Sequence, residues 1–209
     1  MILLYAVIAG LLLGRLAGGR FQELSKVRFE WWQLAVGGLV FQALLFSPAM
    51  SGRVGELGPP LYVGSTLVVL AALARNLTLP GFALIGLGAL LNLVVIVANG
   101  GLMPASPHAF ELVTGDAAVP HDDFSNSVLS GPDTRFGFLG DNLAMPRRLP
   151  FANVFSVGDI LIGLGAAIFL IRAMAGSAAP EARRRPSAAT GMAAGGARPS
   201  VDSSAAEGS

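Results

Sequence analysis

The 209-residue chain is 53% apolar and only 13% charged, with a formal net charge of +1. A soluble domain usually has about 25% charged residues, so this composition excludes an ordinary water-facing shell and indicates a membrane protein. The absence of cysteine excludes disulfides, thiolate nucleophiles and thiolate metal sites, and the balance of charge gives no reason to expect a nucleic-acid partner.

Five apolar stretches are long enough to cross a bilayer, and only helices satisfy the backbone groups of such segments in lipid. They occupy about residues 1–17, 31–47, 58–74, 80–98 and 153–171. We therefore predict an all-α integral membrane protein with a five-helix transmembrane domain over residues 1–172. Residues 99–152 should form a long, partly ordered outer loop, and residues 173–209, which show no periodicity, a disordered tail.

Small residues indicate where these helices should pack closely. Ala6, Gly10, Gly14 and Gly18 recur at every fourth position of the first stretch. The pairs Gly86/Gly88 and Gly163/Gly165 resemble fragments of a nucleotide-binding loop. Both lie in apolar helical stretches with no preceding strand, so we interpret them as packing positions as well.

Basic residues are distributed unevenly between the two sides of the predicted helices. Ten of the 14 lie between the first and second stretches, between the third and fourth, or after the fifth, and four lie on the opposite side. Positive charge favours the cytoplasm, so we expect the N-terminus outside and the C-terminal tail inside. Residues 18–32, on the cytoplasmic side, should form either a short helix in the interface or a charged loop.

The outer loop is unusually long, and its sequence predicts one short helix. Ser106 can cap the helix, Pro107 suits the first turn and Gly115 can end it. Three arginines of this loop are expected to pair with its acids by default, the alternative being lipid phosphates. They are Arg135, Arg147 and Arg148.

The loop also contains both histidines of the chain, and these raise the question of a metal site. The segment "VPHDDF" places His121 beside Asp122 and Asp123, with His108 and Asp116 nearby. Adjacent residues seldom converge on one ion, so we favour a solvated acidic loop and expect neither a metal nor a cofactor.

Asp159 is an acid inside the last apolar stretch, and two explanations stay open. It can form a capping box with Ser156, in which each side chain bonds the other's backbone N–H. Alternatively, the helix begins earlier and Asp159 lies about 9 Å below the outer edge, the depth also expected for Gln42, Ser65 and Asn92. Polar residues at one depth in lipid tend to face each other, which predicts a shared polar layer or simple interhelical bonding. The candidate binding residues are therefore Asp159, Ser156, Asn153, Asn92 and Gln42, with Asn99 and Asp141 above them.

Three segments carry a resemblance to a known family: "NGGLMP" (99–104), "TRFGFLGD" (134–141) and "LPFANVFSVGD" (149–159). Together with the "GGR…WW" stretch they resemble an uncharacterised family of bacterial multi-pass membrane proteins, a domain of unknown function of the DUF5317 type. The likeness extends from residue 1 to about residue 172. It implies a small five-helix protein of the bacterial plasma membrane and brings no assigned activity, ligand or catalytic residue.

For function, we expect a membrane binding or accessory module whose outer loop covers a polar pocket in the outer leaflet. The first alternative is a transporter or channel component that uses Asp159 as an ion or proton site. A weaker one is an enzyme acting on lipid-linked substrates through Asp141 and Asp159, although no catalytic set is evident and we lean against an enzyme. The expected partners are membrane lipids and either another membrane protein or a second copy of the chain.

Overall fold

The computed structural model describes residues 2–47, 50, 53–115 and 127–176, which belong to one structural unit, Met1–Gly176. Its helices are α1 (Ile2–Leu16), α2 (Phe21–Leu24), α3 (Trp32–Leu45), α4 (Gly58–Arg75), α5 (Phe82–Ala98), α6 (Pro107–Thr114) and α7 (Val157–Ala175). Short 3₁₀ turns are η1 (Gly55–Leu57) and η2 (Gly137–Leu139), and the strands are β1 (Met103–Ala105), β2 (Ser127–Leu129), β3 (Leu143–Ala144) and β4 (Val154–Phe155). A helix thus occupies most of each of the five predicted apolar stretches.

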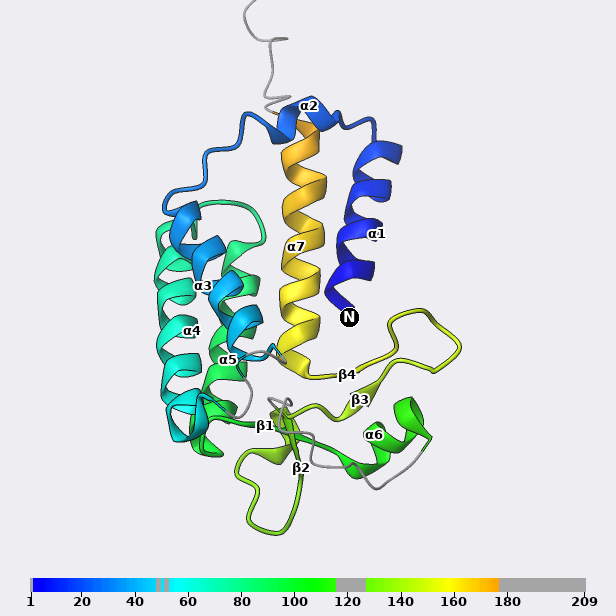
Figure 1. Ribbon diagram of the computed structural model, residues 1–209. Coiled ribbons are helices and arrows are strands. Elements are labelled where there is room, and N and C mark those ends of the chain that lie inside the picture. The colour runs from blue at the N-terminus through cyan, green and yellow to red at the C-terminus, as the bar shows by residue number, and fades with distance from the viewer. Residues whose placement is uncertain (1, 48–49, 51–52, 116–126, 177–209) are drawn as a thin grey trace, which may run out of the picture. The chain divides into compact units, whose positions relative to one another are not determined.

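The long helices lie side by side, with α7 between α1 and α5, α4 against α5, and α3 against α4 (Figure 1). α1 and α7 run in the same direction, while α5 runs in the opposite one. Gly81, which precedes α5, and Gly88 of α5 lie against Gly165 and Gly158 of α7 respectively, so their equal seven-residue spacings match in antiparallel register. A glycine at each contact lets the two backbones approach closely.

The small-residue pattern of α1 packs closely against another helix as predicted, except at its last position, and that helix is α7. Gly10 lies against the backbone of Ala167, and Gly14 lies against Met174. Gly18 lies outside the helix, with a φ of +85° and nothing within 4 Å of the position of a Cβ. Gly19 contacts Met174 instead, because the chain turns at Gly18. Arg20, the residue after Gly19, donates its N–H to the carbonyl oxygen of Met174 at 2.8 Å.

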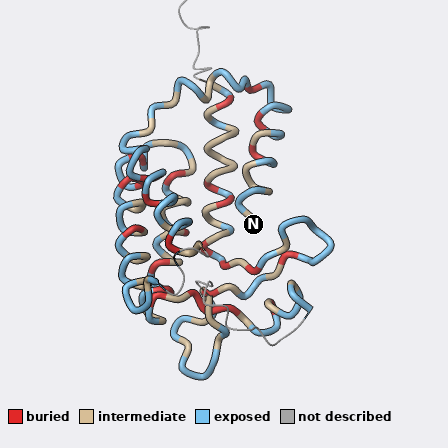
Figure 2. Tube along the Cα trace, in the orientation of Figure 1, coloured by how far each residue is buried: buried red, intermediate tan, exposed pale blue. Residues whose placement is uncertain are grey.

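Two helical segments, Gly55–Arg75 and Val157–Ala175, are long and apolar enough to cross a membrane. Three further helices, α1, α3 and α5, are apolar but shorter. Many residues of these helices are exposed, as the pale blue stretches of the tube in Figure 2 show. Exposed large apolar residues include Leu12 and Leu13 on α1, Leu39 and Val40 on α3, and Leu87 on α5.

The helix in the last apolar stretch, α7, begins and ends later than predicted. It begins at Val157 rather than near residue 153, because Asn153 precedes strand β4 and Ser156 caps the helix. It ends at Ala175, three residues inside the segment that we expected to be tail. Met174 is completely buried against α1, which explains the extension. The 19 residues of α7 are about 28 Å long. A helix that is capped at Ser156 is therefore still long enough to cross a membrane. Residues 177–209 of the expected tail lie outside the described residues.

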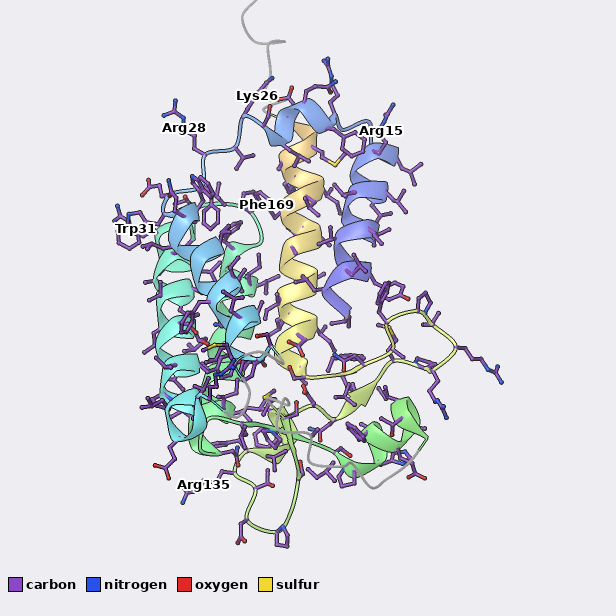
Figure 3. All side chains as sticks on the ribbon, in the orientation of Figure 1. Arg15, Lys26, Arg28, Trp31, Arg135 and Phe169 are labelled. Carbon is purple, nitrogen blue, oxygen red and sulfur yellow. The ribbon has the colours of Figure 1, made fainter. Side chains whose placement is uncertain are left out.

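The chain between α1 and α3 gathers basic and aromatic residues at one end of the long helices. Figure 3 shows Arg15, Lys26, Arg28 and Trp31 at this end. The segment predicted as an interfacial helix or a charged loop contains only the single helical turn α2, and the rest is irregular. An Asn76 clamp fixes its end, because the Asn76 side chain bonds both the N–H and the carbonyl oxygen of Glu30.

At the other end, the predicted outer loop is partly ordered, as expected. β1 pairs in parallel with β2, β3 pairs in antiparallel with β4, and Ala105 and Asp141 form an isolated parallel bridge. α6 has the predicted boundaries: the Ser106 side chain accepts from the N–H of Ala109, and Gly115 ends the helix in the left-handed region. These small elements cover the ends of α5 and α7 and position the candidate site.

Candidate functional site

The start of α7 is a complete capping box. The Ser156 hydroxyl accepts from the N–H of Asp159 at 3.0 Å, and the Asp159 carboxylate accepts from the N–H of Ser156 at 2.9 Å. Two N–H groups that the helix leaves without an internal partner are thereby satisfied, and the carboxylate lies at the positive end of the helix dipole. The capping explanation of Asp159 is confirmed.

Asn92 of α5 bonds the same two residues, so Asp159 also joins two helices. Its amide nitrogen donates to the other carboxylate oxygen of Asp159 at 3.0 Å, and its amide oxygen accepts from the Ser156 hydroxyl at 3.0 Å. Ser156 is completely buried. The three residues form a closed ring of hydrogen bonds, completed by the backbone N–H groups of Ser156 and Asp159, which we call the Asn92 ring. Asp159 therefore both caps α7 and bonds α5, but the earlier helix start that the second explanation required is wrong, because α7 begins at Val157.

The Asn92 ring depends on the close approach of α5 and α7. A Cβ at Gly158 would collide with the amide oxygen of Asn92, and it would lie 2.7 Å from the carbonyl oxygen of Gly88. Gly88 and Gly158 allow the close approach that brings Asn92 within hydrogen-bond distance of Ser156 and Asp159. The same two glycines therefore explain both the helix packing and the polar contacts.

Asp141 approaches the ring from the loop. Its backbone is fixed on both sides, because its N–H bonds the carbonyl oxygen of Pro104 at 2.8 Å and its carbonyl oxygen accepts from Ser106 at 3.0 Å. Its side chain is half-buried. Burial, and secondly the negative charge of Asp159, raise the pKa of Asp141 from its ordinary 3.8 to about 7. The loop thus brings a second carboxyl group within electrostatic range of the Asn92 ring.

This raised pKa predicts that stability falls as the pH rises from about 4 to about 7. In that range the folded protein keeps a proton on Asp141 that the unfolded chain has lost, so deprotonation costs folding free energy, up to about 4 kcal/mol in total. Asp141→Asn should remove this slope and be more stable than wild type above pH 7. Unfolding in detergent micelles across this range measures it. Asp133→Asn, at an exposed loop acid, is the control and should keep the slope. Equal slopes in wild type and Asp141→Asn would contradict the assignment.

The remaining candidates lie elsewhere. Gln42 of α3 donates to Ser65 and Thr66 of α4 at 3.1 Å each. No hydrogen bond between described residues joins this group to the Asn92 ring, so the polar residues form two separate interhelical pairings. Thr66 was missed by the depth argument, although it neighbours Ser65 in sequence.

Asn99 and Asn153 have structural positions above the helices. The Asn99 side chain accepts from the N–H of Arg135 at 2.9 Å and donates to its carbonyl oxygen at 2.8 Å, so it fastens the loop to the end of α5. Asn153 is exposed, and its carbonyl oxygen accepts from Met145 in the extension of the β3–β4 pair. Neither side chain is bonded to the Asn92 ring.

For metal binding, the described residues contain no group of three or more His, Asp or Glu side chains that could hold an ion. His108 is exposed on α6. Asp116 and the triplet His121, Asp122 and Asp123 lie outside the described residues.

Comparison with known proteins identifies relatives of this chain. The model of a family of unknown function, DUF5317, matches residues 26–171. The chain belongs to the DUF5317 family. The matched DUF5317 region contains all seven candidate residues, whereas α1 precedes it.

An uncharacterised protein of Thermotoga maritima is 35% identical over 101 residues, which cover 46% of this chain and 54% of the relative. The chain therefore spans about half the length of the curated relative it matches. No solved structure matches. The family and this relative carry no assigned activity, so the geometry of the site is the basis for function.

Proposed function

We propose that this DUF5317 protein is a five-span integral membrane protein that acts as a binding or accessory module, with its site at the loop-covered ends of α5 and α7. The observation that carries the proposal is the distribution of polarity. The long helices expose Leu, Val and Ile outward and use glycine and a few polar side chains where they touch each other. In water such surfaces favour aggregation, whereas in lipid they are the expected solvent-facing surfaces.

The spans are α1, α3, α4, α5 and α7. The shortest, α3, has 14 residues and is about 21 Å long, so it needs local thinning of the bilayer or flanking residues that snorkel. Consecutive spans alternate in direction. Arg15 at the end of α1, and Lys26 and Arg28 in the segment that joins α1 to α3, lie at one end of the helices (Figure 3). The arginine bias supports placing that end in the cytoplasm of a bacterial cell and the covering loop outside.

The charges at the site favour a ligand that donates hydrogen bonds or carries positive charge. Both oxygens of Asp159 already accept hydrogen bonds, from Asn92 and from Ser156. The carboxyl of Asp141 has no hydrogen bond to a described side chain and is disfavoured as an anion by burial and by Asp159, effects that the chain's N-terminal ammonium offsets only in part. A primary ammonium group would compensate this charge, and at a membrane surface phosphatidylethanolamine is a lipid that presents one.

Bilayer nanodiscs containing the full chain test this ligand class above pH 7, where Asp141 is charged. Replacing phosphatidylcholine by phosphatidylethanolamine should raise the unfolding temperature of the wild type, because only ethanolamine has N–H donors. Asp141→Asn should lose this gain, and the control Asp133→Asn should keep it. An equal gain in all three proteins would mean a general bilayer effect and would contradict binding at the site.

Each oxygen of the Asp159 carboxylate already accepts a hydrogen bond within the protein, which counts against its use as a transported-ion or proton site. Two carboxyl groups without a nucleophile or base between them likewise give little support to an enzyme. Binding is therefore the function that the geometry supports best.

A further inference from the structure

The loop of residues 147–151, between β3 and β4, combines two exposed apolar side chains with two exposed arginines. Leu149 is 44% exposed and Phe151 is 62% exposed. A turn closed by a bond from the Leu149 N–H to the Pro146 carbonyl oxygen, at 2.9 Å, shapes the loop. Phe151 has a φ of +58°, in the left-handed region that bulky residues rarely adopt. The backbone is thus held in an unfavourable conformation while the aromatic ring stays outside the core.

The 147–151 loop is fastened to the first turns of α1. The Tyr5 hydroxyl donates to the carbonyl oxygen of Pro150 at 2.8 Å, although 145 residues separate them in sequence. Figure 1 shows the β3–β4 connection beside the start of α1. The outward residues of these first turns, Leu3, Leu4 and Ile8, are exposed and apolar. The loop therefore lies beside an exposed apolar part of α1, which faces lipid in the proposed function.

The two arginines of the loop have different surroundings. The Arg147 guanidinium lies against Gly115, at the C-terminal end of α6, where the helix dipole favours a cation. Arg148 is exposed, and neither arginine forms an ion pair with a described residue. The default expectation that these arginines pair with loop acids is thus not met within the described part of the chain.

We propose that the 147–151 loop is a membrane-interface anchor that binds the outer leaflet beside α1. Leu149 and Phe151 enter the boundary between headgroups and acyl chains, and Arg148 binds a lipid phosphate. This inference rests on the proposed function, because it requires α1 to face lipid. An arginine beside exposed apolar residues suits this boundary, since its charged end reaches the phosphates while the apolar groups leave water.

The chain has no cysteine, so a single introduced cysteine can carry a nitroxide spin label. The full chain is reconstituted in vesicles of phosphatidylcholine and phosphatidylglycerol, with the label at Leu149→Cys, Leu12→Cys or Asp133→Cys. Leu12 marks the exposed apolar face in the middle of α1, and Asp133 marks an exposed loop position. The measured quantity is the ratio of collision rates with oxygen, which concentrates in lipid, and with a water-soluble nickel chelate.

The anchor predicts a ratio at position 149 several-fold above that at 133 and below that at 12. A ratio at 149 equal to that at 133, with position 12 immersed, would overturn the anchor and leave the proposed function intact. An aqueous ratio at position 12 would overturn the proposed function itself. Spin–spin broadening at 149 that disappears on dilution with unlabelled protein would place a second copy of the chain on the loop and also overturn the anchor.

The role of the charge is tested on the labelled Leu149→Cys protein. Adding Arg148→Gln should reduce immersion of the label, whereas Arg135→Gln should not, because Arg135 lies on another part of the loop region, below the helix ends (Figure 3). Unchanged immersion with Arg148→Gln would remove the phosphate contact from the proposal.

Discussion

Gly88→Ala is expected to lower the free energy of unfolding by about 3 kcal/mol. The added Cβ would collide with the carbonyl oxygen of Gly158 and would lie 3.0 Å from the backbone nitrogen of Ile162. These are backbone atoms of a neighbouring helix, so no side-chain rotation relieves the contact and the two helices must move apart. Such a movement would also stretch the Asn92 ring. Unfolding by denaturant in detergent micelles measures the loss.

Gly86→Ala is the matched control on the same helix. A Cβ at Gly86 meets only the end of the Leu77 side chain, at 3.8 Å. Since alanine favours helix over glycine, this variant should be unchanged or more stable by up to about 1 kcal/mol. Equal losses in the two variants would show that helix propensity or a general effect, and not the contact of α5 with α7, determines the result.

Asp159→Ala should have an effect of similar size, about 3 kcal/mol. Loss of the cap contributes about 1 kcal/mol. The rest arises because Asn92 and the Ser156 N–H lose their acceptor in a partly buried place, at a cost of about 1–3 kcal/mol. The same unfolding measurement applies. Glu56→Ala, at an exposed acid of η1, is the control and should stay within about 0.5 kcal/mol of wild type. A loss of only about 1 kcal/mol for Asp159→Ala would leave the cap as its whole role.

Local sequence signals were sufficient to predict both ends of α6 and the cap of α7. Ser106, Pro107 and Gly115 act through their own backbone neighbours, so the boundaries of α6 follow from residues a few positions apart. The capping box of Ser156 and Asp159 is local in the same sense. These features need no knowledge of tertiary packing.

The pairing of polar residues was only partly predictable. Counting 1.5 Å per residue places Gln42, Asn92 and Asp159 at one depth, but depth does not give the direction in which each side chain points around its helix. Asn92 does reach Asp159, whereas Gln42 faces Ser65 across the contact of α3 with α4. The order in which the helices pack decides the partners, and the apolar pattern does not contain that order.

The contacts of the outer loop, and those of the Asn76 clamp at the opposite end, could not be predicted from the sequence. Asn99 bonds Arg135 across 36 positions, and Tyr5 bonds Pro150 across 145. Asn76 begins a glycosylation-like triplet, and nothing in that pattern indicates its buried bonds to Glu30. Such contacts involve single residues without a repeat, so only the folded arrangement reveals them.

Asp159 joins α5 to α7 at the loop-covered end, in addition to capping α7. A double-mutant cycle of Asp159→Ala with Asn92→Ala measures this link directly, with unfolding free energies determined in the same detergent. We expect a coupling of at least about 1 kcal/mol for this pair and none for Asp159→Ala with Gln42→Ala. Strict additivity of the Asp159 and Asn92 losses would contradict a bond between the two helices at Asp159.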